Sequence, residues 1–169
     1  IKTTIDYHVQ QLAVAALREQ LRVLRSQNVK DGAVLVLETQ TGRVVAYVAN
    51  GGPGNTSAEQ VDGIQTRRQA GSTIKPFVYA AAFDRQLLTP TSLLDDSPAD
   101  ISISSGRVYH PRNYDQTFRG FVGASDALAS SLNVPAVRAL QLVGEPRVLE
   151  HLRALGMTQL KDDDYYGPS

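Results

Sequence analysis

Two short apolar runs, residues 33–37 and 43–48, constrain the fold of this 169-residue chain more than any other feature. They are rich in β-branched residues, and a short turn with Thr41 and Gly42 joins them, so we predict a β-hairpin over residues 33–49. Because both runs are apolar almost throughout, we expect both faces of the hairpin to be covered. Two strands do not make a stable sheet alone. We therefore expect the hairpin to add to strands outside this sequence, the alternative being a very small sheet.

Helical spacing of apolar residues predicts a first helix over residues 6–26, with Asp6 as its N-cap. A second helix is expected to begin at Ser72, with Pro76 in its first turn, where a missing N–H costs least.

Further helical segments are predicted over residues 124–156, with a break near residues 133–135. Between them and the second helix, residues 88–123 contain three prolines and few periodic runs, so we expect an irregular connection there. One hairpin among several helices gives an α/β (α+β) fold class, an antiparallel sheet packed with helices.

Composition excludes several classes of function. Seventeen basic and seventeen acidic residues cancel, which gives no support to a nucleic-acid partner. The absence of cysteine excludes disulfides and thiol catalysis, and no apolar run is long enough to span a membrane. The acidic run 162–164 lacks the alternating ligand positions of a calcium loop, so no metal site is predicted. His8, His110 and His151 lie in no recognisable catalytic triad motif, and we interpret them as surface or packing residues.

Ser72 and Lys75 are the first candidates for catalysis. Residues three apart in a helix share a face, so the amine could reach the hydroxyl, and a serine nucleophile needs an adjacent base to take its proton. The pair alone is weak evidence, because Ser72 could be an N-cap and Lys75 a solvated lysine of the first turn.

A second element, Ser131 and Asn133, follows 59 positions after Ser72, where a helix is predicted to break. A break can project side chains into a cleft. The alternative is a helix C-terminus that Asn133 caps ahead of Pro135.

Together with their flanking residues, the two elements resemble the transpeptidase domain of penicillin-binding proteins, whose serine and lysine motifs they match. The resemblance covers essentially the whole chain, and the hairpin is similar to the first two strands of that domain. It is carried by the hairpin and by residues 3–6, 9–12, 68–79, 111–114, 118–120 and 131–137. Residues 71–79 and 131–137 resemble bifunctional class A enzymes of the penicillin-binding protein 1C type.

The resemblance implies a β-lactamase/transpeptidase-like fold and a serine acyl-enzyme mechanism without a cofactor. Ser72 would attack the carbonyl between the two terminal D-alanines of a peptidoglycan stem peptide, and Lys75, as a neutral amine, would take the Ser72 proton. Ser131 would relay a proton to the departing D-alanine, and Asn133 would bind the peptide amide. An amine of a second stem peptide would accept the acyl group, and β-lactams would acylate the same serine.

The resemblance also implies an extracytoplasmic site in the bacterial cell envelope, with a membrane anchor outside this sequence. The third motif of the family, Lys-Thr/Ser-Gly, does not occur here, and the only lysine downstream of Ser131 is Lys161. We therefore expect residues 1–169 to form the N-terminal portion of the domain. A second chain or segment would supply the third-motif strand, and this portion would be inactive alone.

Two alternatives remain open at this point. One is a β-lactam-sensing or non-catalytic scaffold domain of the same fold. The other is a serine β-lactamase, which also needs a glutamate to activate the deacylating water. No glutamate follows Glu150, which disfavours the second alternative.

Overall fold

The structure, a computed structural model, describes residues 2–102, 108–158 and 160. The chain divides into two compact units, Ile1–Gln69 and Ala70–Ser169. Lys161 and the acidic run 162–164 lie outside the described residues. Within the described ranges, no helix is both long enough and apolar enough to cross a membrane.

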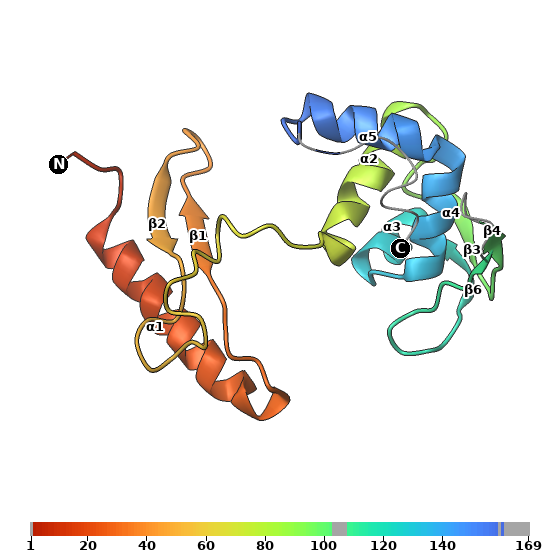
Figure 1. Cartoon of the computed structure of the whole chain (residues 1–169). Helices are drawn as coiled ribbons and strands as arrows, with labels where there is room; N and C mark the ends of the chain where they lie inside the picture. The colour runs from red at the N-terminus through yellow and green to blue at the C-terminus, as the bar shows by residue number, and fades with distance from the viewer. Residues whose placement is uncertain (1, 103–107, 159, 161–169) are drawn as a thin grey trace. The chain divides into compact units, whose positions relative to one another are not determined.

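The first unit is a long helix beside a β-hairpin (Figure 1). Helix α1 spans Tyr7–Val23 and continues as a 3₁₀ turn over Leu24–Gln27. Its N-terminus is capped by Asp6, whose Oδ1 accepts the backbone N–H groups of His8 and Val9 at 2.8 and 3.0 Å.

Strands β1 (Val34–Leu37) and β2 (Val44–Val48) form the hairpin, paired antiparallel from Val34 opposite Val48. One face of the hairpin packs on α1. The buried side chains that join the two elements are Ala13, Leu17, Leu21, Ala46 and Val48.

Within this unit α1 covers one face of the hairpin, and the covering of its other face stays a prediction. Alternate residues of β1 point to opposite faces, and Leu35 and Leu37 are 41% and 50% exposed. The single helix of the unit reaches only the face opposite to these two leucines. The apolar character of β1 therefore exceeds what the packing of this unit needs.

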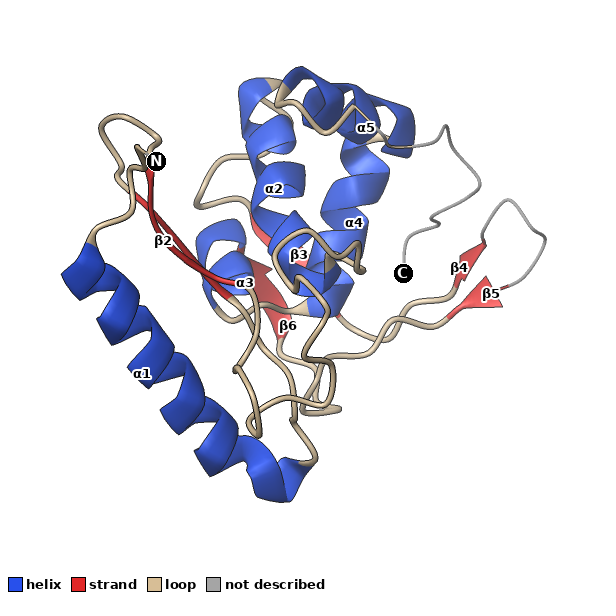
Figure 2. Cartoon of the chain, turned by 60° about the vertical axis from the view of Figure 1, so that its left-hand side comes forward, coloured by secondary structure: helices blue, strands red, loops and turns tan. Residues whose placement is uncertain are grey.

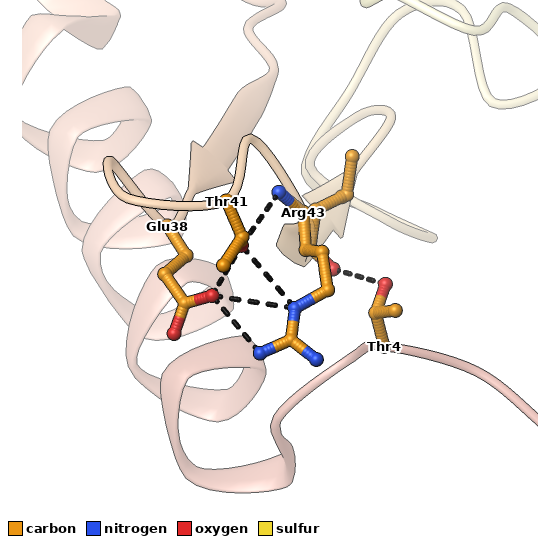
Figure 3. Close-up of polar contacts among 5 residues, drawn as sticks. Thr4, Glu38, Thr41 and Arg43 are labelled. Atoms are coloured by element: carbon orange, nitrogen blue, oxygen red, sulfur yellow. Dashed lines mark hydrogen bonds and ion pairs between the residues drawn. The ribbon is translucent and has the colours of Figure 1, made fainter.

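The turn between the strands is held by an exposed polar cluster (Figure 3). Glu38 Oε2 accepts from Thr41 Oγ1 and, at 3.0 Å, from Arg43 Nη2. On the other side Thr4 Oγ1 donates to the carbonyl of Val44 at 2.6 Å. Exposed ion pairs of this kind contribute about 0–1 kcal/mol, so the cluster orders the turn more than it stabilises the unit.

In its described part, the second unit combines four helices with short strands (Figure 2). Its elements, after a 3₁₀ turn, are α2 (Lys75–Asp84), β3 (Leu93–Asp96), β4 (Ile101–Ser102), β5 (Val108–Tyr109), β6 (Gly120–Gly123), α3 (Ala124–Ala129), α4 (Asn133–Val143) and α5 (Glu145–Ala154). Helix α2 packs on α4, and α5 contacts both helices. Helix α3 contacts the strands β3 and β6, and α4 contacts β3.

The core of this unit lies where the small residues of α2 and α4 meet, which lets the two helices approach closely. It includes Tyr79, Ala82, Ala139, Val143 and Val148. This packing brings the N-terminal ends of α2 and α4 together.

The expected irregular connection over residues 88–123 is wrong in part. Strand β3 pairs antiparallel with β6, from Leu93 opposite Gly123 to Asp96 opposite Gly120, and β4 pairs with β5. The described residues therefore hold three two-stranded sheets rather than one hairpin. Sequence patterns do not reveal these strands because each is only two to four residues long. In addition, β3 contains aspartate and β6 contains glycine, and both residue types are depleted in strands.

Candidate active site

Ser72 lies in a 3₁₀ turn, Gly71–Ile74, and the α-helix begins only at Lys75. The predicted α-helical start at Ser72 is therefore displaced by three residues. In an α-helix the Ser72 carbonyl would accept the N–H of residue 76, but that residue is proline and has none. The carbonyl accepts the N–H of Lys75 instead, which is the hydrogen bond of a 3₁₀ turn.

The side chain of Ser72 is exposed, and its residue is not an N-cap. The 3₁₀ turn begins with Gly71 at φ +53°, in the left-handed region that glycine adopts without strain. Among the described residues, no hydrogen bond joins Ser72 Oγ to Lys75 Nζ.

Lys75 is buried, with 7% of its surface exposed. Its Nζ lies 2.5 Å from the carbonyl oxygen of Ser131, 2.6 Å from Asn133 Oδ1 and 3.1 Å from Ser131 Oγ. The alternative of a solvated first-turn lysine is therefore wrong. Of the four candidate residues, the structure brings Lys75, Ser131 and Asn133 into direct contact.

The second motif lies in the turn between α3 and α4. Helix α3 ends at Ala129 and α4 begins at Asn133, so the break falls at residues 130–132 rather than 133–135. Asn133 opens α4 and does not cap α3, which overturns the C-terminal capping alternative. Pro135 is the third residue of α4, where it needs no N–H partner.

Ser131 has a left-handed backbone conformation, with φ at +52°. Such a conformation is uncommon for a residue other than glycine and costs on the order of 1–3 kcal/mol. It directs both the carbonyl and the hydroxyl of Ser131 to Lys75 Nζ.

Burial lowers the pKa of the Lys75 ammonium below its usual value, because desolvation disfavours the charged form. The three oxygen partners suit both protonation states. The ammonium donates three N–H bonds. The neutral amine donates two, to the carbonyl of Ser131 and to Asn133 Oδ1, and its lone pair accepts the Ser131 hydroxyl proton. Protons can therefore pass between Lys75 and Ser131 without rearrangement of the site.

Asn133 is itself fixed by contacts from the segment before β6. Its Nδ2 donates to the carbonyl of Arg112 at 2.7 Å, and its backbone N–H donates to Asn113 Oδ1 at 2.8 Å. Asn113 in turn donates from Nδ2 to Asp96 Oδ1 and Oδ2 at 2.8 and 3.0 Å.

Asp96 and Asn113 are buried polar residues that the sequence did not single out. Residues 111–114 carry part of the resemblance to the family, and this signal leads to Asn113. Nothing in the local pattern marks Asp96, the last residue of an unpredicted strand. Within the described ranges, no group of three or more His, Asp or Glu side chains could hold a metal ion.

Residues 32–167 match the model of the family described as the penicillin-binding protein transpeptidase domain. The chain belongs to this transpeptidase family. Among curated relatives, penicillin-binding protein 1C of Escherichia coli is 41% identical over 97 residues, which cover 57% of this chain and 12% of that protein.

Solved structures of the transpeptidase family agree with the fold. Penicillin-binding protein 1A of Haemophilus influenzae is 32% identical, with a TM-score of 0.66 over 75% of this chain and 18% of that chain. PonA1 of Mycobacterium tuberculosis in complex with penicillin V is 22% identical, with a TM-score of 0.69 over 96% of this chain and 40% of that chain. The curated relatives are class A penicillin-binding proteins, and this chain spans about a fifth or less of their length. The predicted family and fold class are confirmed.

Proposed function

We propose that this chain carries the nucleophile, base and proton relay of a peptidoglycan D,D-transpeptidase that forms a serine acyl-enzyme on D-Ala-D-Ala stem peptides. The observation that carries the proposal is the buried Lys75 amine, bonded to both Ser131 and Asn133 three residues after an exposed serine. A lysine that is to act as a base must be neutral near pH 7, and burial moves its pKa in that direction.

In the proposed reaction Ser72 Oγ attacks the carbonyl between the terminal D-alanines, and Lys75 Nζ accepts its proton. Ser131, whose hydroxyl lies 3.1 Å from Lys75 Nζ, passes a proton to the departing D-alanine nitrogen. The half-buried Asn133 binds the amide of the stem peptide. An amine of a second stem peptide then attacks the acyl-enzyme, which releases Ser72 and completes the cross-link.

The remaining parts of the proposal concern the complete protein. The third-motif strand, with its lysine and one oxyanion-hole N–H, is supplied by a segment or chain outside residues 1–169, and these residues alone are inactive. Removal of one oxyanion donor typically slows a reaction by about a hundredfold to a thousandfold. The reaction takes place at the bacterial cell envelope, on the extracytoplasmic side, where peptidoglycan is made. β-Lactams acylate Ser72, as the penicillin V complex of PonA1 suggests for this fold.

The test is labelling of the full-length protein with a fluorescent penicillin, followed by mass spectrometry of the labelled peptide. We expect label on Ser72, loss of label in Ser72→Ala, and unchanged labelling in Ser125→Ala, which removes an exposed serine from α3. Label on any other residue contradicts the proposed nucleophile. Residues 1–169 alone are expected to label far more slowly, and equal rates would contradict the need for a third motif.

A cross-linking assay separates the transpeptidase from the sensor. With donor and acceptor stem peptides, the proposed enzyme forms the cross-linked product at a rate that Ser72→Ala abolishes. Penicillin acylation without any cross-linked product would indicate the sensing domain instead. Rapid release of hydrolysed penicillin would indicate a β-lactamase.

A further inference from the structure

We infer that Asp96 and Asn113, which lie outside both motifs, are positioning residues that set the place and hydrogen-bond polarity of Asn133, and through it of Lys75. The inference rests on the proposed function, because it assigns these residues to the same site. It follows from a continuous chain of hydrogen bonds that begins at a buried carboxylate and ends at the lysine amine.

The orientation of the Asn113 amide is fixed by its surroundings. Its Nδ2 faces three acceptor oxygens, the two of the Asp96 carboxylate at 2.8 and 3.0 Å and the carbonyl of Thr117 at 2.8 Å. An ionised carboxylate and a carbonyl only accept, so the amide nitrogen must point to them. Oδ1 of Asn113 must then point the other way, to the backbone N–H of Asn133 at 2.8 Å.

That N–H belongs to the first residue of α4, and the first N–H groups of a helix have no partner within it. The residue that precedes the helix is Leu132, which has no side-chain oxygen to cap it. Asn113 provides the missing acceptor from 20 positions away. The start of α4 is therefore placed by Asn113 rather than by its own flanking sequence.

The side chain of Asn133 is oriented by the same segment. Its Nδ2 donates to the carbonyl of Arg112, the residue next to Asn113, at 2.7 Å. This contact leaves Oδ1 as the group that faces Lys75 Nζ at 2.6 Å. Asp96 thus acts on Lys75 through the segment that it holds: Asn113 contacts the backbone N–H of Asn133, and the carbonyl of Arg112 contacts its side chain.

Asp96 is suited to this role because its side chain is fully buried and acts only as an acceptor. Besides Asn113, it accepts the backbone N–H of Arg119 at 3.0 Å. An asparagine at position 96 has only one acceptor oxygen, whereas the Asn113 amino group and the Arg119 backbone N–H both donate to this side chain. Either its amino group would face that of Asn113, or Asn113 would turn over and present its amino group to the N–H of Asn133. Both arrangements place donors against donors.

The test is the Asp96→Asn variant of the full-length protein, with Asp95→Asn as the matched control. Asp95 lies next to Asp96 on β3, but its carboxylate contacts Arg138 at 3.0 Å and Ser97 at 2.9 Å rather than the network. At a temperature where each protein is folded, we expect penicillin acylation to slow about tenfold to a hundredfold in Asp96→Asn. Asp95→Asn should label at the wild-type rate. A purely structural role would lower the melting temperature but leave the rate per folded molecule and its pH profile unchanged, and that result would overturn the inference.

A double variant that exchanges the two side chains, Asp96→Asn with Asn113→Asp, provides a second measurement. The amide introduced at position 96 donates to the carboxylate introduced at position 113 and accepts the backbone N–H of Arg119. That carboxylate also accepts the N–H of Asn133, although it faces the carbonyl of Thr117 as well. We expect a rate between those of wild type and Asp96→Asn. If Asp96→Asn does not fold, Asn113→Asp takes its place in the comparison, and a double variant that labels no faster than the single variant would overturn the inference.

The inference and the proposed function can fail separately. If wild type is not labelled by penicillin, the proposed function fails. The positioning role is then read directly from Lys75, by NMR titration of its side chain in isotope-labelled protein. A shift of the Lys75 titration in Asp96→Asn, but not in Asp95→Asn, supports the role, and no shift in either variant overturns it.

Discussion

Lys75 Nζ lies 2.6 Å from Asn133 Oδ1, and the two residues, 58 positions apart, are the first residues of α2 and α4. The contact therefore joins two helix N-termini. The positive ends of both helix dipoles disfavour a cation there, which acts in the same direction as burial, the cause that lowers the pKa of Lys75. The start points of the two helices therefore favour the neutral form of Lys75 over its charged form.

The pH dependence of acylation follows from this arrangement. In the proposed mechanism the neutral amine of Lys75 is the active form, so we expect the acylation rate to rise with pH and to level off above the pKa of Lys75. Burial lowers that pKa from 10.5, so we expect the midpoint of the rise to lie below pH 10.5. Second-order rate constants for penicillin acylation across the neutral and alkaline range measure it. A midpoint at or above that of free lysine would contradict a buried base.

Asn133→Asp is expected to move this midpoint upward. A carboxylate in place of the amide, with an oxygen 2.6 Å from Lys75 Nζ, stabilises the ammonium. It also loses the Nδ2 donor to the carbonyl of Arg112. Acylation near neutral pH should fall by about tenfold or more, since one pKa unit changes the neutral fraction tenfold. Gln141→Glu is the control, because it adds a charge at an exposed position of α4. Equal effects in both variants would mean that general charge, not this contact, is responsible.

Much of the fold follows from local sequence, because its causes are local. The cap at Asp6, the spacing of Leu17 and Leu21 and the turn at Gly42 are sufficient to indicate the first helix and the hairpin. The strands β3 and β6 could not be found in this way. The two strands pair across more than twenty intervening residues. The reason for an aspartate at position 96 becomes clear only from its hydrogen bonds with Asn113.

The candidate site, too, can be predicted from the sequence only in part. Ser72 and Lys75 are linked by spacing, and Ser131 and Asn133 likewise, so each pair is visible in the sequence. The sequence does not show which atoms donate and which accept in the hydrogen bonds between the two pairs. That polarity depends on Asn113, whose role appears only when α4 is in place.

Tyr79→Phe should stabilise the protein. The Tyr79 hydroxyl is buried and has no hydrogen-bond partner within the described residues, and its removal relieves a desolvation cost of about 1–3 kcal/mol. Tyr114→Phe, at a fully exposed position, is the control and should change nothing. Chemical denaturation at neutral pH measures both. A loss of stability in Tyr79→Phe would mean that the hydroxyl has a partner, such as a bound water.

Tyr79→Phe also tests how the free energy of unfolding changes at alkaline pH. Burial, together with the negative charge of Asp96, raises the pKa of Tyr79 from 10.0 to about 12. The folded state then holds a proton that the unfolded state releases, so stability is lost as pH rises from 10 toward about 12. At about 1.4 kcal/mol per pKa unit, the loss due to this residue is on the order of 2 kcal/mol. The difference in unfolding free energy between wild type and Tyr79→Phe should widen over that range, and a constant difference would contradict the assignment.

Ser131→Gly and Ser131→Ala separate the backbone of the second motif from its hydroxyl. Both variants remove Oγ, which lies 3.1 Å from Lys75 Nζ, and we expect both to slow acylation by about a hundredfold, the lower end of the range for a proton-transfer group. Only alanine keeps the strain of φ +52°. Glycine adopts this conformation freely, so Ser131→Gly should be more stable than Ser131→Ala by about 1 kcal/mol. Thermal unfolding and acylation rates, measured on the same samples, give both quantities. If the glycine variant labelled at the wild-type rate, the role of the Ser131 hydroxyl as a proton relay would be wrong, whatever its effect on stability.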